Sequence, residues 1–157
     1  MSTADPRIIV PYTELNELVI DELGKTGFPL ECVPVSSDDD AYRRLLRDLW
    51  QQRRTVFICE HDVLVWPGAV KELFDCSCVW GAYSYELHGG IGIYHGFGAT
   101  KITPTLMDAV PDIWNEPCKW DVLDQKLYFA ARAVGYEPHP HRPPVVHLSK
   151  KHARRYA

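Results

Sequence analysis

Two acidic residues, Glu60 and Asp62, directly follow the very apolar segment 55–59. An apolar run of this length is typical of a strand that is covered on both faces of a parallel sheet. Residues i and i+2 of an extended chain point to the same side, so both carboxylates should converge just beyond the strand's carboxyl end. Ligands of open α/β sheets bind at this edge. Paired carboxylates suit a hard divalent cation, Mg²⁺ or Mn²⁺, although the two acids can also simply solvate a strand end.

The pattern around these acids predicts the elements that would position them. Short apolar runs at 7–12 and 30–35 predict two further strands before the one at 55–59. Thr13 and the acids at 38–40 are expected to cap the helices between them. The first helix should turn Leu15, Leu18, Val19 and Leu23 inward, and the second shows the strongest helical period, at Tyr42, Leu45, Leu46, Leu49 and Trp50.

The second half of the chain mixes helices and strands. Helices are expected to begin at Pro67, at Thr103-Pro104 and near Leu123, the last being closed by Gly135. Strands are expected at 78–85 and 145–147. Strand and helix alternate through the first half, which predicts an α/β fold, a three-layer sandwich around a mainly parallel, mixed sheet.

Composition restricts the class of protein. The 157 residues suit one domain, which we place at 1–149 with a basic C-terminal tail at 150–157. A net charge of −4 argues against a general nucleic-acid binder. No apolar run approaches the roughly 18 residues of a membrane span, and the N-terminus does not resemble a signal peptide. Five cysteines without a C-x-x-C motif favour reduced, mostly buried thiols, so we expect a cytoplasmic enzyme.

The order of these features resembles the nucleotide-sugar-binding half of GT-A glycosyltransferases. Their metal motif is usually Asp-x-Asp, and here it reads Glu60-His61-Asp62. Residues 96–104 resemble the segment that leads from the sheet to the acceptor side. Residues 123–127, followed by Gly135-Tyr136, resemble the family's Glu-Asp-x-x-Leu helix and Ala-Gly-Tyr ending. Residues 145–147 resemble the late strand whose histidine often completes the metal shell, so the match extends over most of 7–149.

The resemblance implies roles for individual residues. Asp62 would bind the metal most directly, Glu60 would bind the metal, its water or the donor ribose, and His147 would be a further ligand. Asp124 falls on the catalytic carboxylate and would take the proton of the acceptor hydroxyl. Asp121 is the second choice for this base, and it can equally be an acid at a helix start.

Further positions would border the donor nucleotide. They follow the first two strands: Pro11, Tyr12 and Thr13 would lie beside the base, and Asp38 would bond the base or ribose. The family's usual acid before Asp124 is replaced by Leu123, and the chain is short, which reduces the part that binds the acceptor.

The function implied is a metal-dependent, hexosyltransferase-like glycosyltransferase that uses Mn²⁺ or Mg²⁺. It would move a sugar from a nucleoside diphosphate sugar to an unidentified glycan, protein or small molecule, with inversion. Two alternatives remain on the same fold. A nucleotidyltransferase usually has a glycine-rich, basic loop after the first strand, which residues 11–16 lack. A non-catalytic module would recognise a sugar or a partner.

Cysteine and histidine pairs allow another site. Cys76 and Cys78 together with His139 and His141 offer four potential zinc ligands. Each pair has only one intervening residue, whereas two to four are usual. We therefore expect the histidines to be polar loop residues or groups on the acceptor side.

Three other features each allow two interpretations. The glycine-rich stretch 89–98 lacks a G-x-G-x-x-G fingerprint and is either a flexible loop or a close approach to a sugar. The basic tail can fold over a diphosphate, but a solvated end is favoured. Aromatic residues are expected in the core more than under a sugar ring, namely Trp80, Tyr83, Tyr85, Trp114 and Trp120.

Overall fold

A six-stranded mixed sheet organises the chain. The computed structural model describes residues 6–86, 93–94, 96–142 and 145–148. The strand order is β2-β1-β3-β8-β5-β9. The bounds are β1 Arg7–Tyr12, β2 Leu30–Pro34, β3 Val56–Cys59, β5 Trp80–Tyr83, β8 Ala99–Ile102 and β9 His139–His141. Only β8 runs antiparallel to its neighbours in this sheet, so the predicted mainly parallel, mixed sheet is confirmed.

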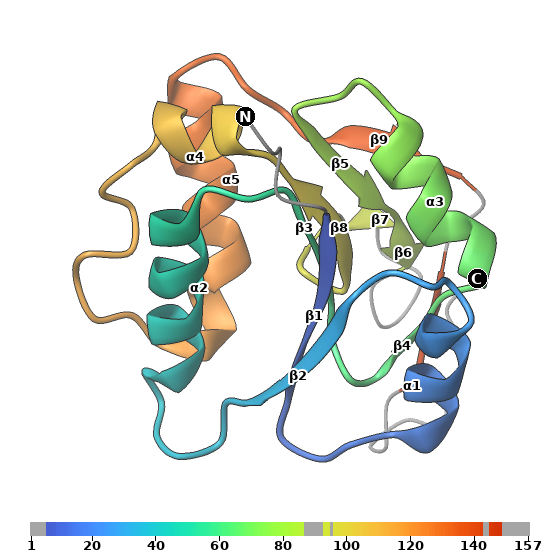
Figure 1. Ribbon diagram of the computed structural model, residues 1–157. Coiled ribbons are helices and arrows are strands. Elements are labelled where there is room, and N and C mark those ends of the chain that lie inside the picture. The colour runs from blue at the N-terminus through green and yellow to red at the C-terminus, as the bar shows by residue number, and fades with distance from the viewer. Residues whose placement is uncertain (1–5, 87–92, 95, 143–144, 149–157) are drawn as a thin grey trace.

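Helices cover both faces of this sheet (Figure 1). One face carries α2 (Ala41–Gln52), α4 (Pro104–Ala109), the short turn η1 (Trp120–Val122) and α5 (Leu123–Ala133), and the other carries α1 (Glu17–Gly24) and α3 (Pro67–Asp75). Two small ribbons complete the fold: β4 (Val63–Leu64) pairs with β10 (Val146–His147), and β6 (Tyr85–Glu86) pairs with β7 (Ile93–Tyr94). The three-layer prediction is confirmed.

Alternation along β3 shows how the two cores form. Val56 and Ile58 join the cluster under α2, α4 and α5, whereas Phe57 and Cys59 join the cluster under α1 and α3. All four side chains are buried, as expected for a strand covered on both faces. The aromatic residues Trp80, Tyr83 and Trp114 are buried too, and Trp120 is 64% exposed.

The start of α1 differs from the prediction. The cap is Asn16, whose Oδ1 accepts from the backbone N–H groups of Leu18 and Val19 at 3.1 and 3.4 Å. Thr13 lies three residues earlier and does not cap this helix. Since the helix begins late, Leu15 precedes it and Leu18 falls on its outer side, and both are about half exposed, at 48% and 51%.

Two other predictions need correction. His139 and His141 lie in β9 and not in a loop, because this segment pairs in parallel with β5. The five cysteines are free as expected, but only Cys59 is fully buried. Parts of the glycine-rich stretch, and the whole basic tail 150–157, lie outside the described residues.

Candidate active site

Glu60 and Asp62 lie on a turn that follows β3. The strand ends at Cys59, and the Val63 N–H donates to the Glu60 carbonyl at 3.0 Å. The chain is therefore not extended here. The prediction that an extended backbone would point both side chains the same way was wrong. The Glu60 N–H donates to the Gly98 carbonyl at 3.1 Å, which holds the turn against the start of β8.

Asp62 is brought against His147. The two-residue strands β4 and β10 pair so that His147 lies opposite Val63, the residue after Asp62. The Leu148 N–H donates to the Asp62 carbonyl at 2.5 Å and fixes the same crossing. As a result His147 Nε2 lies 3.4 Å from Asp62 Oδ2, although these residues are far apart in the chain.

Asp124, in the first turn of α5, lies close enough to Glu60 for the two charges to interact. Burial raises the pKa of Glu60 to about 8, and the negative charges of Asp62 and Asp124 add to this rise. The hydroxyl of Tyr42, on α2, interacts with Glu60 and works in the opposite direction. Burial also raises the pKa of Asp124, against hydrogen bonds that include a 2.7 Å donation from the Gln125 N–H to its Oδ1. A carboxylate that faces two other negative charges at one edge is an arrangement that a cation would stabilise.

A buried ion pair holds the segment that leads into α5. The Arg43 side chain, 5% exposed, donates to both carboxylate oxygens of Asp40 and to the Trp114 carbonyl at 2.9 Å. Asp40 Oδ1 also accepts from the Cys118 N–H at 3.0 Å. These bonds tie residues 114–118 to the start of α2. The same end of α2 carries Tyr42, which interacts with Glu60. The Asp40–Arg43 pair therefore holds the segment that precedes η1 and α5.

The donor set fits a hard divalent cation. Ligands of an octahedral Mg²⁺ at about 2.1 Å lie about 3 Å apart, and Asp62 Oδ2 and His147 Nε2 are separated by 3.4 Å. Glu60 contributes a third ligand, a second carboxylate that is close enough to be repelled by that of Asp62. Carboxylates with one imidazole suit Mn²⁺ as well as Mg²⁺.

The residues expected beside a nucleotide follow the neighbouring strands. Pro11 is buried, Tyr12 is half-buried and Thr13 is exposed, all at the carboxyl end of β1. This end lies beside Glu60, because β1 and β3 are parallel with Ile9 opposite Ile58. The residues predicted to border the nucleotide therefore lie at the same edge of the sheet as Glu60.

Asp38 already has partners. Its carboxylate accepts from Arg44 at 2.8 Å and from the Asp40 N–H at 2.8 Å. The hydrogen bond from the Arg44 guanidinium is the main reason that the pKa of Asp38 lies below its usual value. A ribose or base that used Asp38 would have to share it with Arg44. Asp121, the second choice for the base, is exposed on η1.

Sequence reasoning missed two contributors. Tyr42 was assigned only to the core, but its hydroxyl also reaches Glu60. Phe97 lies within the glycine-rich stretch and stacks on the Tyr42 ring at 6.0 Å between centroids, which supports that tyrosine. The sequence did contain a signal for Tyr42. It lies in the first turn of the helix that follows the strand at 30–35, and the end of that strand was already expected to border the nucleotide.

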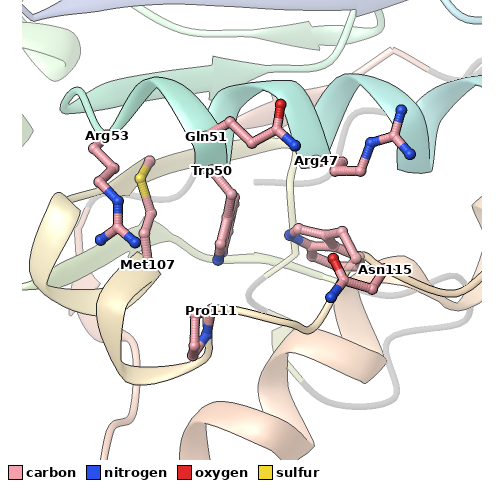
Figure 2. Close-up of a pocket in the computed structure, with 8 residues that line it drawn as sticks. Arg47, Trp50, Gln51, Arg53, Met107, Pro111 and Asn115 are labelled. Carbon is pink, nitrogen blue, oxygen red and sulfur yellow. The ribbon is translucent and has the colours of Figure 1, made fainter.

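A small pocket lies elsewhere. Figure 2 shows it between the second half of α2 and the segment after α4, with Arg47, Trp50, Met107 and Asn115 around it. It lies toward the end of α2 opposite to Tyr42. Asp108 of α4 is ion-paired with Arg53 beside it. It contains none of the predicted site residues.

Comparison with known proteins supports the fold and not the chemistry of individual residues. No family model matches the sequence, and no curated protein matches it. Among solved structures, A197 from STIV superposes with a TM-score of 0.62 at 13% identity, covering 94% of this chain and 87% of that one. A glycosyltransferase involved in the glycosylation of the major capsid of PBCV-1 superposes with a TM-score of 0.57 at 14% identity, covering 88% and 82%.

These likenesses extend over nearly the whole of each chain. At such low identity they establish a shared fold, while donor, metal and mechanism are not established by them. Within the described residues, no helix has both the length and the apolar character needed to cross a membrane. The chain therefore has an α/β fold of the kind found in a solved glycosyltransferase, with acidic residues gathered at the carboxyl edge of its sheet.

Proposed function

We propose that this protein is a metal-dependent glycosyltransferase. It would transfer a sugar from a nucleoside diphosphate sugar to an acceptor hydroxyl, with inversion. One observation carries the proposal: Glu60, Asp62, Asp124 and His147, from three separate segments, interact at one edge of a sheet whose fold is shared with a solved glycosyltransferase.

Asp62 and His147 would hold the cation, Mn²⁺ or Mg²⁺, with Glu60 bound to it directly or through water. When bound, such an ion supplies positive charge to the departing diphosphate. The remaining contribution of these residues is orientation. Asp62 is fixed through its own carbonyl by Leu148, and the Glu60 backbone is fixed by Gly98.

Asp124 would act as the general base. It lies at the start of α5, partly buried, so its raised pKa strengthens it as a proton acceptor. The Gln125 N–H holds one carboxylate oxygen. That bond leaves the second oxygen to take the proton as the acceptor oxygen attacks the anomeric carbon.

Pro11, Tyr12 and Thr13 would form the border of the nucleotide base, with Asp38 on the ribose or base. The acceptor remains open between a glycan, a protein and a small molecule. On donor binding, the Asp38 carboxylate would give up its hydrogen bond from Arg44 and accept one from the ribose or base instead.

The test is a binding panel. Thermal shift and calorimetry would compare uridine, guanosine, adenosine and cytidine diphosphates and their common sugar conjugates, each with Mn²⁺, Mg²⁺ or chelator. One nucleotide should stabilise the protein in a metal-dependent way, because a ligand at a hundredfold excess over Kd adds about 2.7 kcal/mol.

Asp62→Asn should remove the metal dependence, whereas Asp48→Asn, an exposed acid on α2, should bind like the wild type. Equal nucleotide affinity in Mn²⁺ and in chelator would contradict the metal site. Nucleotide-sugar binding that survives Asp62→Ala, in a protein without turnover, would support the non-catalytic module instead.

A further inference from the structure

Four potential metal ligands meet beside β5 and β9, on the other side of β8 from the strand that leads to the acidic site. Cys76 and Cys78 follow α3, and His139 and His141 lie on the edge strand β9. One ligand atom from each lies within 4.8 Å of all the others. The grouping of these four residues as potential zinc ligands, which the sequence analysis named but did not favour, is therefore present in the structure.

The parallel pairing of β5 with β9 explains the meeting. His139 lies opposite Gly81 and His141 lies opposite Tyr83. Because side chains alternate along a strand, these two histidines share one face, with Pro140 on the other. The cysteines enter from the turn between α3 and β5, on that same face. Each pair of ligands has one intervening residue, which is unusual when both ligands of a pair lie on a turn. On a strand this spacing is suitable, because residues i and i+2 point to the same face.

The distances match a tetrahedral site. His139 Nδ1 lies 3.2 Å from His141 Nε2 and 3.9 Å from Cys76 Sγ. Zinc bonds of about 2.3 Å to sulfur and about 2.0 to 2.1 Å to nitrogen, at tetrahedral angles, place ligand atoms about 3.3 to 3.8 Å apart. The side chains need to move by little to surround an ion.

Gly81 makes room for the cluster. A Cβ at this position would lie 2.8 Å from Cys78 Sγ and 2.7 Å from Leu73 Cδ2, and 3.6 Å from His141 Nε2. Real Cβ atoms do not approach other atoms so closely. The absence of a side chain at position 81 is therefore what allows Cys78 and His141 to face each other across β5.

Glu72 orients His141. The Nδ1 atom of His141 lies 3.1 Å from Glu72 Oε1, and the Tyr83 hydroxyl donates to Glu72 Oε2 at 2.9 Å. With its proton on Nδ1, the ring presents the lone pair of Nε2 to the cluster. A carboxylate behind a histidine in this way is the usual second contact of a zinc-binding imidazole.

Lys101 completes the surroundings. It is only 2% exposed, and its ammonium donates to the Cys76 carbonyl at 2.6 Å and reaches the Cys78 thiol. The bond to the Cys76 carbonyl ties the cysteine turn to β8.

We propose that Cys76, Cys78, His139 and His141 form a structural zinc site. Two thiolates and two imidazoles in a tetrahedral arrangement favour Zn²⁺ over the hard cations that suit the acidic site. Four protein ligands leave no open position, so the ion would fasten β9 to the α3–β5 turn and not act on substrate. Such a fastening suits β9, which has three residues and a proline that donates no hydrogen bond.

The first experiment measures metal content. The full chain, purified with zinc and passed through a desalting column, should carry about one zinc per molecule by elemental analysis. Cys76→Ser and His139→Ala should lose it, and Cys118→Ser, a half-buried cysteine outside the cluster, should keep it. His139 is exposed, so its alanine variant should fold even where the cysteine variant does not.

A second experiment identifies the ligands. Titration of the metal-free protein with Co²⁺ should produce the intense visible bands of a tetrahedral ion together with thiolate-to-cobalt charge transfer. Zinc should abolish both signals and should protect two of the five cysteines from alkylation. Folded protein that shows no cobalt bands, or zinc content unchanged in both Cys76→Ser and His139→Ala, would overturn the proposal.

The role of Glu72 has its own readout. Glu72→Gln should weaken zinc affinity by about 10- to 100-fold in competition with a chelator, while leaving one zinc per chain at saturation. Glu22→Gln, a partly exposed acid on α1, is the matched control. Unchanged affinity in Glu72→Gln would remove Glu72 as the orienting group.

Discussion

Glu60 occupies a position that costs stability unless a cation is bound. Its carboxylate is partly buried and faces the charges of Asp62 and Asp124. At pH 7 in chelator, Glu60→Gln should therefore raise the free energy of unfolding by about 1 to 3 kcal/mol, because the wild-type carboxylate must take up a proton, or keep a disfavoured charge, when the chain folds. Urea unfolding of both proteins measures this difference.

Addition of Mn²⁺ provides the control for that prediction. The ion should stabilise the wild type and should stabilise Glu60→Gln much less, because one carboxylate ligand has become a neutral amide. A variant that is less stable than the wild type in chelator would show that Glu60 is held by contacts that outweigh the repulsion.

Asp124 and Asp121 are the two candidates for the general base, and substitution can distinguish them. Both lie near the start of α5, but Asp124 is partly buried and interacts with Glu60, whereas Asp121 is exposed. Asp124→Asn should lower kcat by about 10² to 10⁴ while donor affinity changes little, because only proton transfer is removed. Steady-state kinetics with the donor from the binding panel checks this.

Asp121→Asn is the direct comparison. Its effect on kcat should be small, since an exposed acid on η1 has no counterpart interaction with Glu60 in the described residues. A large loss in Asp121→Asn with normal turnover in Asp124→Asn would exchange the two roles. Normal turnover in both would argue against an inverting mechanism with a carboxylate base.

At the scale of elements, α2 depends on the pair between Asp40 and Arg43. Asp40→Asn should cost about 2 kcal/mol, because it leaves the buried guanidinium without its anion. The cost stays below that of a fully buried pair, since a quarter of the Asp40 side chain is exposed. Chemical denaturation at neutral pH measures it, with exposed Asp39→Asn as the neutral control.

The same pair gives a pH dependence whose sign is fixed. The hydrogen bonds of Arg43 hold the pKa of Asp40 well below its usual value. A depressed pKa adds stability above the unfolded-state pKa of about 3.9 and loses it as the pH falls below that value. The difference between wild type and Asp40→Asn should be constant from neutral pH to about pH 5 and should shrink toward pH 3. A constant difference at all these pH values would contradict the ion pair as its source.

The first helix offers a matched pair of caps. Asn16→Ala should destabilise the protein by about 1 kcal/mol, because two N–H groups lose their acceptor. Thr13→Ala should change stability by less than about 0.5 kcal/mol, as expected for an exposed residue outside the helix. Thermal and urea unfolding of both variants decide between the two positions, and equal losses would contradict Asn16 as the cap.

That comparison also shows where sequence reasoning was sufficient. The strands at 7–12 and 55–59 were predictable because continuous apolar runs require a sheet covered on both faces. The start of α1 was not, because Thr13 and Asn16 can both accept from backbone N–H groups. Which of the two residues caps the helix depends on where β1 ends and α1 begins. These limits are set by tertiary packing and not by the local sequence.

At the scale of the whole molecule, the pairings between distant segments were the hardest to predict. The edge strand β9 has no apolar run, and it exists because β5 offers it an open edge. The meeting of Cys76 with His139 follows from that pairing alone. By contrast, the convergence of Glu60 with Asp124 was expected from the family resemblance, and the turn that carries Glu60 and Asp62 was not.

The two proposed metal sites are separated across the sheet, and the two cysteines of the zinc site lie beyond the other end of the strands from Glu60. Glu60 follows the carboxyl end of β3, whereas Cys78 precedes the amino end of β5, and β8 lies between these strands. Adjacent strands are about 4.8 Å apart, so the sites are separated by two strand spacings across the sheet and by the strand length along it. Effects on stability at such a separation are expected to add.

A double-mutant cycle of Cys76→Ser and Asp62→Asn tests this independence. In zinc and Mn²⁺, the loss in the double variant should equal the sum of the single losses within about 0.5 kcal/mol. Each single variant should retain the other metal, measured by zinc content and by Mn²⁺ titration. A coupling above about 1 kcal/mol would mean that β8, whose Lys101 contacts the cysteine turn and whose Ala99 pairs with Cys59, transmits changes between the two edges.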